Sequence, residues 1–427
     1  MLNRQQFVRG IGSTALLSHV PGWAADAAAE PPNATARTVP VPIDHDAAHR
    51  GTFPLEYLVA GEIAPKKPTV LVIADGQQFS VRADAMPGFR KLFGDDVNIV
   101  GIPGRGSAKP LLDLLGDPAA SAADWILAYR LLRYRQWVAD IDAVRSSVLG
   151  KNAKILIFGT SGGAFLLHTY MAAFGKNVRA AYSEVAALPP MEAEIGLQHD
   201  KFWQELDEDD RKLLWSAITA HPGNRTLYAQ LFQRQNYFVE LDGLKDARHD
   251  LIAAIAKDDQ AVIEKASVDY QVDAVIRMMS TTAAWSIRVR EFEFVWPILG
   301  DREWKKTEFR PDVEVSDLLA KPLLDLQAGG KITAPTFDLR PLNDVSAEVL
   351  VVCGRYDHIS DYREEIAIAE HYRNHLLLIL DDDHMMHDFK AIPDARPSLV
   401  QAWTKGLHDP SFADALKKIE PIRWRES

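Results

Sequence analysis

A Gly-Thr-Ser-Gly-Gly pentapeptide, residues 159–163, stands between two segments of different character. The apolar run 155–158 before it has the length and composition of a buried strand, and the stretch 164–168 after it reads as the start of a helix. Glycines around Ser161 allow a turn too sharp for larger side chains. The pattern predicts a strand, a tight turn and a helix, with the Ser161 hydroxyl at the helix N-terminus. If the turn has no chemical role, Ser161 only caps the helix.

The C-terminal third of the chain supplies a base and an acid for a serine nucleophile. A serine hydroxyl needs a histidine to take its proton and a carboxylate to orient that histidine. The apolar run 348–353 stops shortly before Asp357, and the next apolar run, 375–380, leads to His384. Two neighbouring parallel strands would bring both side chains to the sheet edge that holds Ser161. The sequence predicts Ser161 as nucleophile, His384 as base and Asp357 as acid, an order along the chain that differs from those of chymotrypsin and subtilisin.

These features together resemble the α/β-hydrolase superfamily, in particular the proline iminopeptidase-like branch of serine hydrolases. The resemblance rests on the pentapeptide, the glycine-to-aspartate step that ends at Asp357, and His384 after an apolar run. It extends from about Val39 to the last helix, because the segments 41–45 and 52–57 are similar to the opening strands of that branch. It implies the α/β class and the α/β-hydrolase fold, in which helices flank a mostly parallel central sheet.

The oxyanion hole of this fold uses two backbone N–H groups, one from the residue after the nucleophile and one from the loop after the third strand. Gly162 and Gln77 occupy these two places. The chain departs from the branch at Asp75, which stands where a His-Gly-Gly type loop has histidine. It departs again in the segment 101–107, which lacks the acidic residue of the usual Asp-x-Arg-Gly-x-Gly-x-Ser. These departures motivate an alternative from another class, a non-catalytic binding protein on a hydrolase scaffold.

Neighbouring residues compete for the roles of base and acid. In many α/β-hydrolases a pair of histidines three residues apart follows the last strand, and the first is the base, so His384 is preferred over His387. Asp361 stands where the helix 362–372 should begin, and a carboxylate is expected there for helix capping alone.

The run 381–387 holds several aspartates and histidines, so a metal site is a further alternative. No second ligand group stands at a recognised spacing, and the zinc helix motif needs histidines four apart. We therefore expect neither a metal nor a cofactor.

The middle of the chain, residues 188–345, reads as helices with charged faces and no convincing strand. We expect it to form a helical cap inserted between two parts of the hydrolase core, 28–187 and 346–427. Its most unusual piece interleaves aromatic and charged residues, so the aromatic rings could hold an apolar or proline-like group while a carboxylate binds a substrate ammonium. The alternative is a lid helix that packs its aromatic face on the core. The candidate residues are Trp285, Glu291, Glu293 and Trp296.

Composition excludes some classes of function. The 427 residues carry a formal net charge of −11, which argues against a nucleic-acid binder. The single cysteine, Cys353, rules out an intrachain disulfide and is expected to pack as a small apolar side chain. No run reaches the ~18 apolar residues of a membrane span. The expected partner is a small molecule or a short peptide, and the sequence leaves the oligomeric state open.

Residues 1–27 resemble a bacterial export signal. Arg4 and Arg9 give a positive start, a short apolar stretch follows, and small residues stand at the cleavage spacing near Ala27. The segment 3–9 is similar to a twin-arginine signal with Gln5 in place of the second arginine. The expected location is periplasmic or secreted, and it is cytoplasmic if the N-terminus is instead an amphipathic or disordered extension.

The resemblance implies a serine hydrolase that forms an acyl-enzyme and removes an N-terminal proline or small apolar residue. The alternative within the same chemistry is a carboxylic ester hydrolase.

Overall fold

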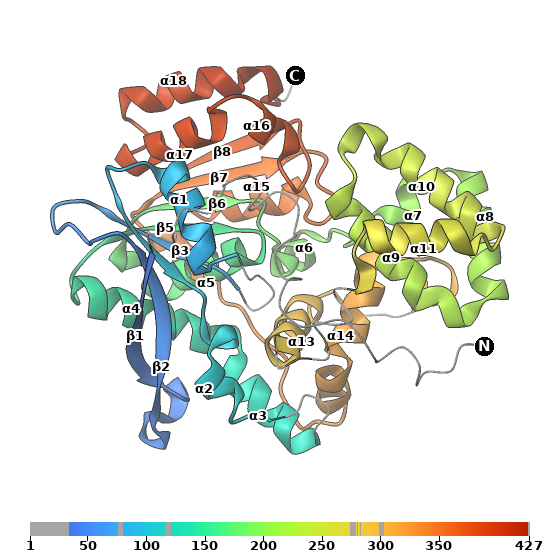
Figure 1. The fold of residues 1–427 in the computed structure, drawn as a ribbon, viewed down its shortest axis with the longest axis horizontal. Helices are drawn as coiled ribbons and strands as arrows, with labels where there is room; N and C mark the ends of the chain where they lie inside the picture. The colour runs from blue at the N-terminus through green and yellow to red at the C-terminus, as the bar shows by residue number, and fades with distance from the viewer. Residues whose placement is uncertain are drawn as a thin grey trace.

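The computed structural model describes residues 34–75, 80–116, 121–273, 279, 281, 283–298 and 303–425. An eight-stranded sheet runs through the molecule in the order β1-β2-β4-β3-β5-β6-β7-β8 (Figure 1). The strands are β1 (Ala34–Pro42), β2 (Thr52–Ala60), β3 (Thr69–Ile73), β4 (Asn98–Ile102), β5 (Ile155–Thr160), β6 (Val178–Glu184), β7 (Glu348–Gly354) and β8 (His375–Leu380).

The sheet is antiparallel only at one end. β2 pairs antiparallel with both β1 and β4, and every pairing from β4 to β8 is parallel. The central strands β3, β4 and β5 are buried along their whole length, which is why they read as continuous apolar runs. A mostly parallel sheet in this order confirms the predicted fold class.

Helices cover both faces of the sheet (Figure 1). Alternate residues of the strands point to opposite faces, so Val70 and Val72 belong to one apolar cluster while Leu71 and Ile73 belong to the other. The cluster of Val70 is closed by α1 (Met86–Phe93), α16 (His387–Ala391), α17 (Ala395–Lys405) and α18 (Pro410–Ile419). The cluster of Leu71 is closed by α3 (Ala122–Leu132), α4 (Tyr134–Leu149), α5 (Gly162–Phe174) and α15 (Tyr362–Glu370).

Every regular element described between β6 and β7 is a helix. They are α6 (Pro189–Ile195), α7 (Phe202–Glu205), α8 (Glu208–Ala220), α9 (Arg225–Phe238), α10 (Leu241–Ala256), α11 (Gln260–Asp269), α13 (Ala283–Val295) and α14 (Pro311–Ala328), with η5 (Pro222–Asn224), η6 (Glu303–Lys306) and η7 (Arg340–Asp344) as short 3-10 turns. The remaining short elements are α2 (Lys109–Leu112), η1 (His45–Arg50), η2 (Ala83–Ala85), η3 (Arg105–Ser107), η4 (Gly175–Asn177) and η8 (Glu420–Ile422).

The inserted helices divide between two cores. Phe202, Phe232 and Phe309 belong to an apolar cluster of the insertion itself. Helix α13 instead contributes Trp285 and Phe292 to the main cluster that packs on the sheet. Figure 1 shows α13 beside α14 and nearer to the sheet than α8, α10 and α11, which form an outlying lobe.

The segment 101–107, which lacks the usual acidic residue, obtains one from α4. Arg105 is fully buried and forms two hydrogen bonds with the carboxylate of Asp140, at 2.7 and 2.8 Å. Its remaining N–H groups donate to backbone carbonyls, among them that of Leu131 at 2.6 Å. A buried guanidinium needs such complete pairing, and this one ties the loop after β4 to α4.

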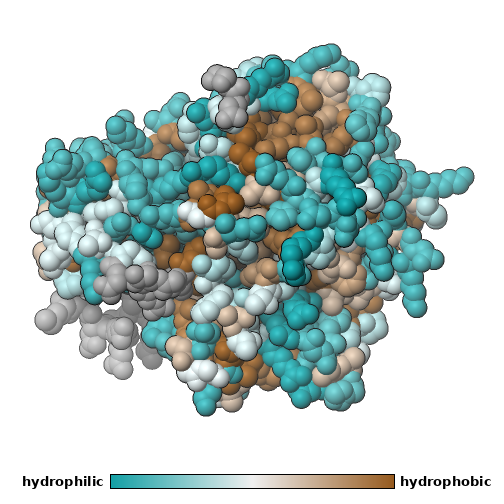
Figure 2. Space-filling view, turned by 180° about the vertical axis from the view of Figure 1, so that it is seen from behind, coloured by the Kyte–Doolittle hydropathy of each residue, from teal (hydrophilic) through white to brown (hydrophobic). Residues whose placement is uncertain are grey.

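The predicted export signal, 1–27, lies outside the described residues. None of the helices in the described part of the chain combines the length and apolarity needed to span a membrane. Cys353 is buried inside β7, as its apolar surroundings in the sequence predicted. On the face turned away in Figure 1, hydrophilic residues predominate and hydrophobic residues gather in separate areas (Figure 2).

Gly354, the last residue of β7, offers a test of packing near the carboxyl edge of the sheet. A Cβ atom at this position would lie 2.6 Å from the carbonyl oxygen of Asp382 and 2.7 Å from that of Asp383, and backbone atoms cannot move aside cheaply. Gly354→Ala should therefore lower the free energy of unfolding by roughly 1–3 kcal/mol, measured by urea denaturation. The matched control is Gly223→Ala, because nothing lies within 4 Å of a Cβ there. Equal stability of the two variants would contradict this account.

Candidate active site

Ser161 forms the sharp turn between β5 and α5. Its backbone adopts φ 51° and ψ −127°, a left-handed conformation that a residue other than glycine rarely takes. The turn is held by a hydrogen bond from the Ser161 N–H to the carbonyl of Glu184, at 2.9 Å. A Cβ on Gly159 would lie 2.5 Å from the carbonyl oxygen of Gly163, so only glycine fits there. The predicted strand, turn and helix are thus present.

The structure brings Ser161, His384 and Asp357 together. The Nε2 atom of His384 lies 3.1 Å from the Ser161 Oγ, and its Nδ1 atom lies 2.7 Å from Oδ2 of Asp357. Asp357 follows β7 and His384 follows β8, so the parallel pairing of these strands delivers both side chains to the same edge. The two are 9% and 6% exposed, which shields their hydrogen bond from water.

The Asp357 carboxylate is fixed by further hydrogen bonds. It accepts from the backbone N–H groups of Ile359 and Ser360, at 2.7 and 2.9 Å, and from the Ser360 hydroxyl at 2.8 Å. A carboxylate held in this way can orient the imidazole so that Nδ1 carries a proton and Nε2 is free to accept one from Ser161.

The competing histidine and aspartate have other partners. Nδ1 of His387 lies 2.6 Å from Asp383, at the start of α16. Asp361 is the N-cap of α15 and forms a capping box with Glu364. Burial alone would raise the pKa of Asp361, but hydrogen bonds from Arg363 and Lys201 outweigh it and lower the pKa to about 2. Asp361 is therefore engaged at the helix start, as its position in the sequence suggested.

One of the two residues predicted for the oxyanion hole is described. Gly162 is buried and is the first residue of α5, whose N-terminus is the positive end of the helix dipole. Gln77 lies outside the described residues. The carboxylate of Asp75 packs directly against Gly162, since a Cβ there would lie 2.2 Å from Oδ2 of Asp75.

The aromatic and acidic residues predicted on α13 have different surroundings. Trp285 is fully buried, packs on Trp125 and donates its indole N–H to the carbonyl of Gly116 at 3.1 Å. Glu293 is also fully buried, forms an ion pair with Arg290 and accepts from the N–H of Tyr134 at 2.8 Å. Glu291 and Trp296, in contrast, are only partly buried.

Glu291 belongs to a group of charged residues whose other members sequence reasoning missed. The lid acid cluster comprises Glu192, His199, Glu291 and Asp312. His199 lies between two of the acids, with Nδ1 2.8 Å from Glu192 and Nε2 2.7 Å from Asp312. These acids outweigh the effect of burial and raise the pKa of His199 well above its ordinary value. No local sequence motif predicts this cluster, because its members come from three helices and a loop.

The lid acid cluster lies close to the histidine of the site. The ring of Tyr237, on α9, lies 5.9 Å from that of His384, edge to face. Burial, chiefly, raises the pKa of Tyr237, and the charges of Asp312, Glu291 and Asp357 contribute to the shift. The charges that act on Tyr237 thus come both from the cluster and from Asp357.

Glu291 has a strongly shifted proton affinity. Burial, and next the negative charge of Asp312, raise its pKa from 4.5 to about 8, although the Ser316 side chain donates a hydrogen bond to it. The protonated form of Glu291 is therefore favoured at neutral pH, although the positive charge of His199 acts in the opposite direction.

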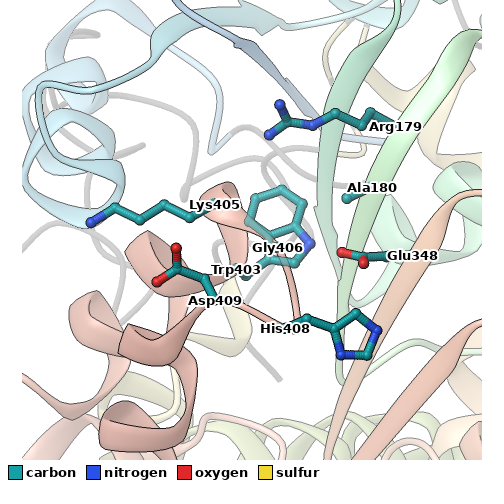
Figure 3. Close-up of a pocket in the computed structure, with 8 residues that line it drawn as sticks. All are labelled: Arg179, Ala180, Glu348, Trp403, Lys405, Gly406, His408 and Asp409. Carbon is teal, nitrogen blue, oxygen red and sulfur yellow. The ribbon is translucent and has the colours of Figure 1, made fainter.

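A cavity of about 390 Å³ lies at the opposite edge of the sheet (Figure 3). Ala180 and Glu348, which pair in register near the amino ends of β6 and β7, line it. Basic and acidic side chains are mixed in its wall, where Arg179, Lys405 and His408 lie with Glu348 and Asp409 around Trp403. It is separate from Ser161, which follows the carboxyl end of β5. Within the described ranges, no group of three or more metal-ligating side chains is arranged to hold a metal ion.

The strand order and the turn at Ser161 decide the architecture. The chain has the α/β-hydrolase fold. Similar solved structures include a proline iminopeptidase from Mycobacterium smegmatis, with 15% identity and a TM-score of 0.47 over 87% of this chain and 98% of that one. The esterase RhEst1 from Rhodococcus sp. ECU1013 has 14% identity and a TM-score of 0.42 over 87% and 99% of the two chains. A bromoperoxidase from Bacillus anthracis has 12% identity and a TM-score of 0.40 over 89% and 100%. No family model and no curated protein matches this hydrolase-fold chain.

The raised pKa of Glu291 predicts how stability depends on pH. The folded protein keeps a proton on Glu291 that the unfolded chain releases near pH 4.5, so the contribution of Glu291 to wild-type stability should fall as the pH rises from 4.5 to about 8. Glu291→Gln removes this dependence. Between pH 4.5 and about 8, the free energy of unfolding of Glu291→Gln relative to that of wild type should therefore increase by up to about 1.4 kcal/mol per pH unit. Urea denaturation of both proteins at pH 5 and pH 8 measures the difference, and an unchanged difference would refute the assignment.

Proposed function

We propose that the protein is a serine hydrolase that works through an acyl-enzyme. The observation that carries this proposal is the continuous chain of hydrogen bonds from Ser161 Oγ through His384 to the fixed carboxylate of Asp357. It contains a nucleophile, a base within reach of it and an anion that orients the base.

The proposed reaction has two halves. Ser161 Oγ attacks the carbonyl carbon while His384 Nε2 takes its proton, and the oxyanion is held by the N–H groups of Gly162 and Gln77. His384 then gives the proton to the leaving group as the bond to it breaks. In the second half, His384 takes a proton from water, the hydroxide attacks the acyl carbon, and Ser161 Oγ leaves with that proton.

We further propose an aminopeptidase-like substrate, with an N-terminal proline or small apolar residue. The lid acid cluster supports the binding of a substrate ammonium, because two carboxylic acids, Glu291 and Asp312, lie near each other close to His384. A cation beside Glu291 would favour its ionised form and so gain a charged partner. Among the residues predicted to touch substrate, we assign this role to Glu291 and Trp296. Trp285 and Glu293, whose polar groups are engaged within the protein, we assign to holding α13 in place.

The location of the protein belongs to the same proposal. We propose that residues 1–27 direct export and are then removed, which places the enzyme in the periplasm or outside the cell. N-terminal sequencing of the processed protein tests this, and an intact Met1 would refute it.

The cooperation of Ser161 and His384 can be tested directly. Ser161→Ala and His384→Ala should each lower kcat by roughly 10⁴-fold or more, and the double variant should lose hardly more than either alone, because the members of a catalytic unit act together. Hydrolysis of p-nitrophenyl acetate and labelling by a fluorophosphonate provide the measurements. His387→Ala is the matched control and should keep nearly full activity. Equal rates for wild type and Ser161→Ala, with ligand binding retained, would favour the non-catalytic binding protein.

A second test addresses the substrate. With a panel of aminoacyl-naphthylamides, Glu291→Gln should raise KM by roughly 10-fold or more, because a charge-assisted hydrogen bond to the ammonium is lost. The KM for p-nitrophenyl acetate, which has no ammonium group, should stay unchanged and serves as the internal control. If wild type cleaves the ester but none of the naphthylamides, the protein is an esterase instead.

A further inference from the structure

Three buried charged side chains lie behind the turn at Ser161. Arg290 of α13 forms an ion pair with Glu293 one turn further on, and its Nε atom lies 3.7 Å from Oδ2 of Asp75. All three residues are fully buried. Charges so far from water interact strongly, and the removal of one partner leaves another uncompensated.

Asp75 lies where a negative charge affects the proposed chemistry. Its Oδ2 atom occupies the space beside Gly162, where a Cβ would lie only 2.2 Å away. The N–H group of Gly162 is one of the two that we propose to bind the oxyanion. A carboxylate beside that group would oppose the charge that develops on the substrate oxygen, unless a cation offsets it.

Arg290 is placed to supply that cation. Its guanidinium packs against the rings of Phe165 and Phe294, at 5.3 and 5.0 Å from their centroids, and these contacts fix its position. Phe165 belongs to α5, the helix that begins directly after Ser161. Among the described residues, the Nε and Nη2 atoms of Arg290 are buried without a hydrogen-bond partner. The guanidinium therefore acts on Asp75 through its charge more than through a hydrogen bond.

We propose that Arg290 is a positioning residue for the oxyanion site, and that it acts by neutralising and fixing the Asp75 carboxylate against Gly162. This inference rests on the proposed function. It makes α13, a helix of the insertion, part of the machinery on which catalysis depends.

The test is the rate at which a fluorophosphonate labels Ser161 in the full-length protein. In this reaction Ser161 Oγ bonds to phosphorus, fluoride leaves, the serine proton passes to His384, and the phosphonyl oxygen occupies the oxyanion position. Arg290→Met should slow labelling by roughly 100-fold, comparable to the loss of one oxyanion donor. Asp75→Asn in the same chain should restore labelling to within roughly 10-fold of wild type, because the harmful charge is gone.

Two variants separate this role from a structural one. Arg288→Met changes the same type of residue on the same helix, but Arg288 donates to the carbonyl of Leu319 at 2.9 Å and should label like wild type. Arg290→Lys keeps the positive charge and should retain most of the rate. Near-ultraviolet circular dichroism verifies that each variant is folded.

Each outcome has a distinct meaning. Labelling of Arg290→Met at the wild-type rate would overturn this inference but leave the proposed function standing. The same holds if the double variant Asp75→Asn/Arg290→Met is labelled as slowly as Arg290→Met. If Arg290→Met does not fold, the comparison of Arg290→Lys with Asp75→Asn/Arg290→Met decides, and slow labelling in both overturns the inference. Wild-type protein that is folded but not labelled at Ser161 would overturn the proposed function and, with it, this inference.

Discussion

The turn at Ser161 is the constraint around which the structure is arranged. The strained backbone conformation is kept because β5 lies between β3 and β6, and the hydrogen bond from the Ser161 N–H to Glu184 anchors the turn to the neighbouring strand. Glycines at 159 and 162 are required by the atoms that surround them, among them the side chain of Asp75. The position of the hydroxyl therefore follows from the sheet, and Asp357 and His384 approach it from β7 and β8, which lie on one side of β5.

The loop that carries His384 is also held in place by hydrogen bonds. The Asp382 carboxylate accepts hydrogen bonds from three backbone N–H groups, those of Asp383, Asp388 and Phe389. Lys390 donates to the carbonyl of Met385, so both sides of the loop are held. Gly354 allows the end of β7 to approach this loop closely. A histidine on such a loop keeps its distance to Ser161 without help from a ligand.

The sequence predicted the candidate site residues that lie just after the ends of strands. Ser161, Asp357 and His384 each follow an apolar run, and parallel strands deliver such residues to one edge, so local patterns sufficed to bring them together. Glu192, His199 and Asp312 could not be found in this way, because each looks like an ordinary polar residue of a helix or loop. Their meeting depends on how the inserted helices pack. Trp285 shows the same limit, since the pattern around it left both a ligand contact and a core position open.

The insertion between β6 and β7 has a consequence for the nascent chain. The neighbours β6 and β7 pair in parallel, yet Glu184 and Glu348 bound a long insertion between them. At the usual rates of synthesis, the ribosome needs roughly ten to thirty seconds to make the insertion, and during this time one edge of β6 is unpaired. The strand that pairs with this edge, β7, has not yet been made. An open parallel edge is a template for aggregation, so the intermediate is exposed to this hazard until the second part of the sheet emerges.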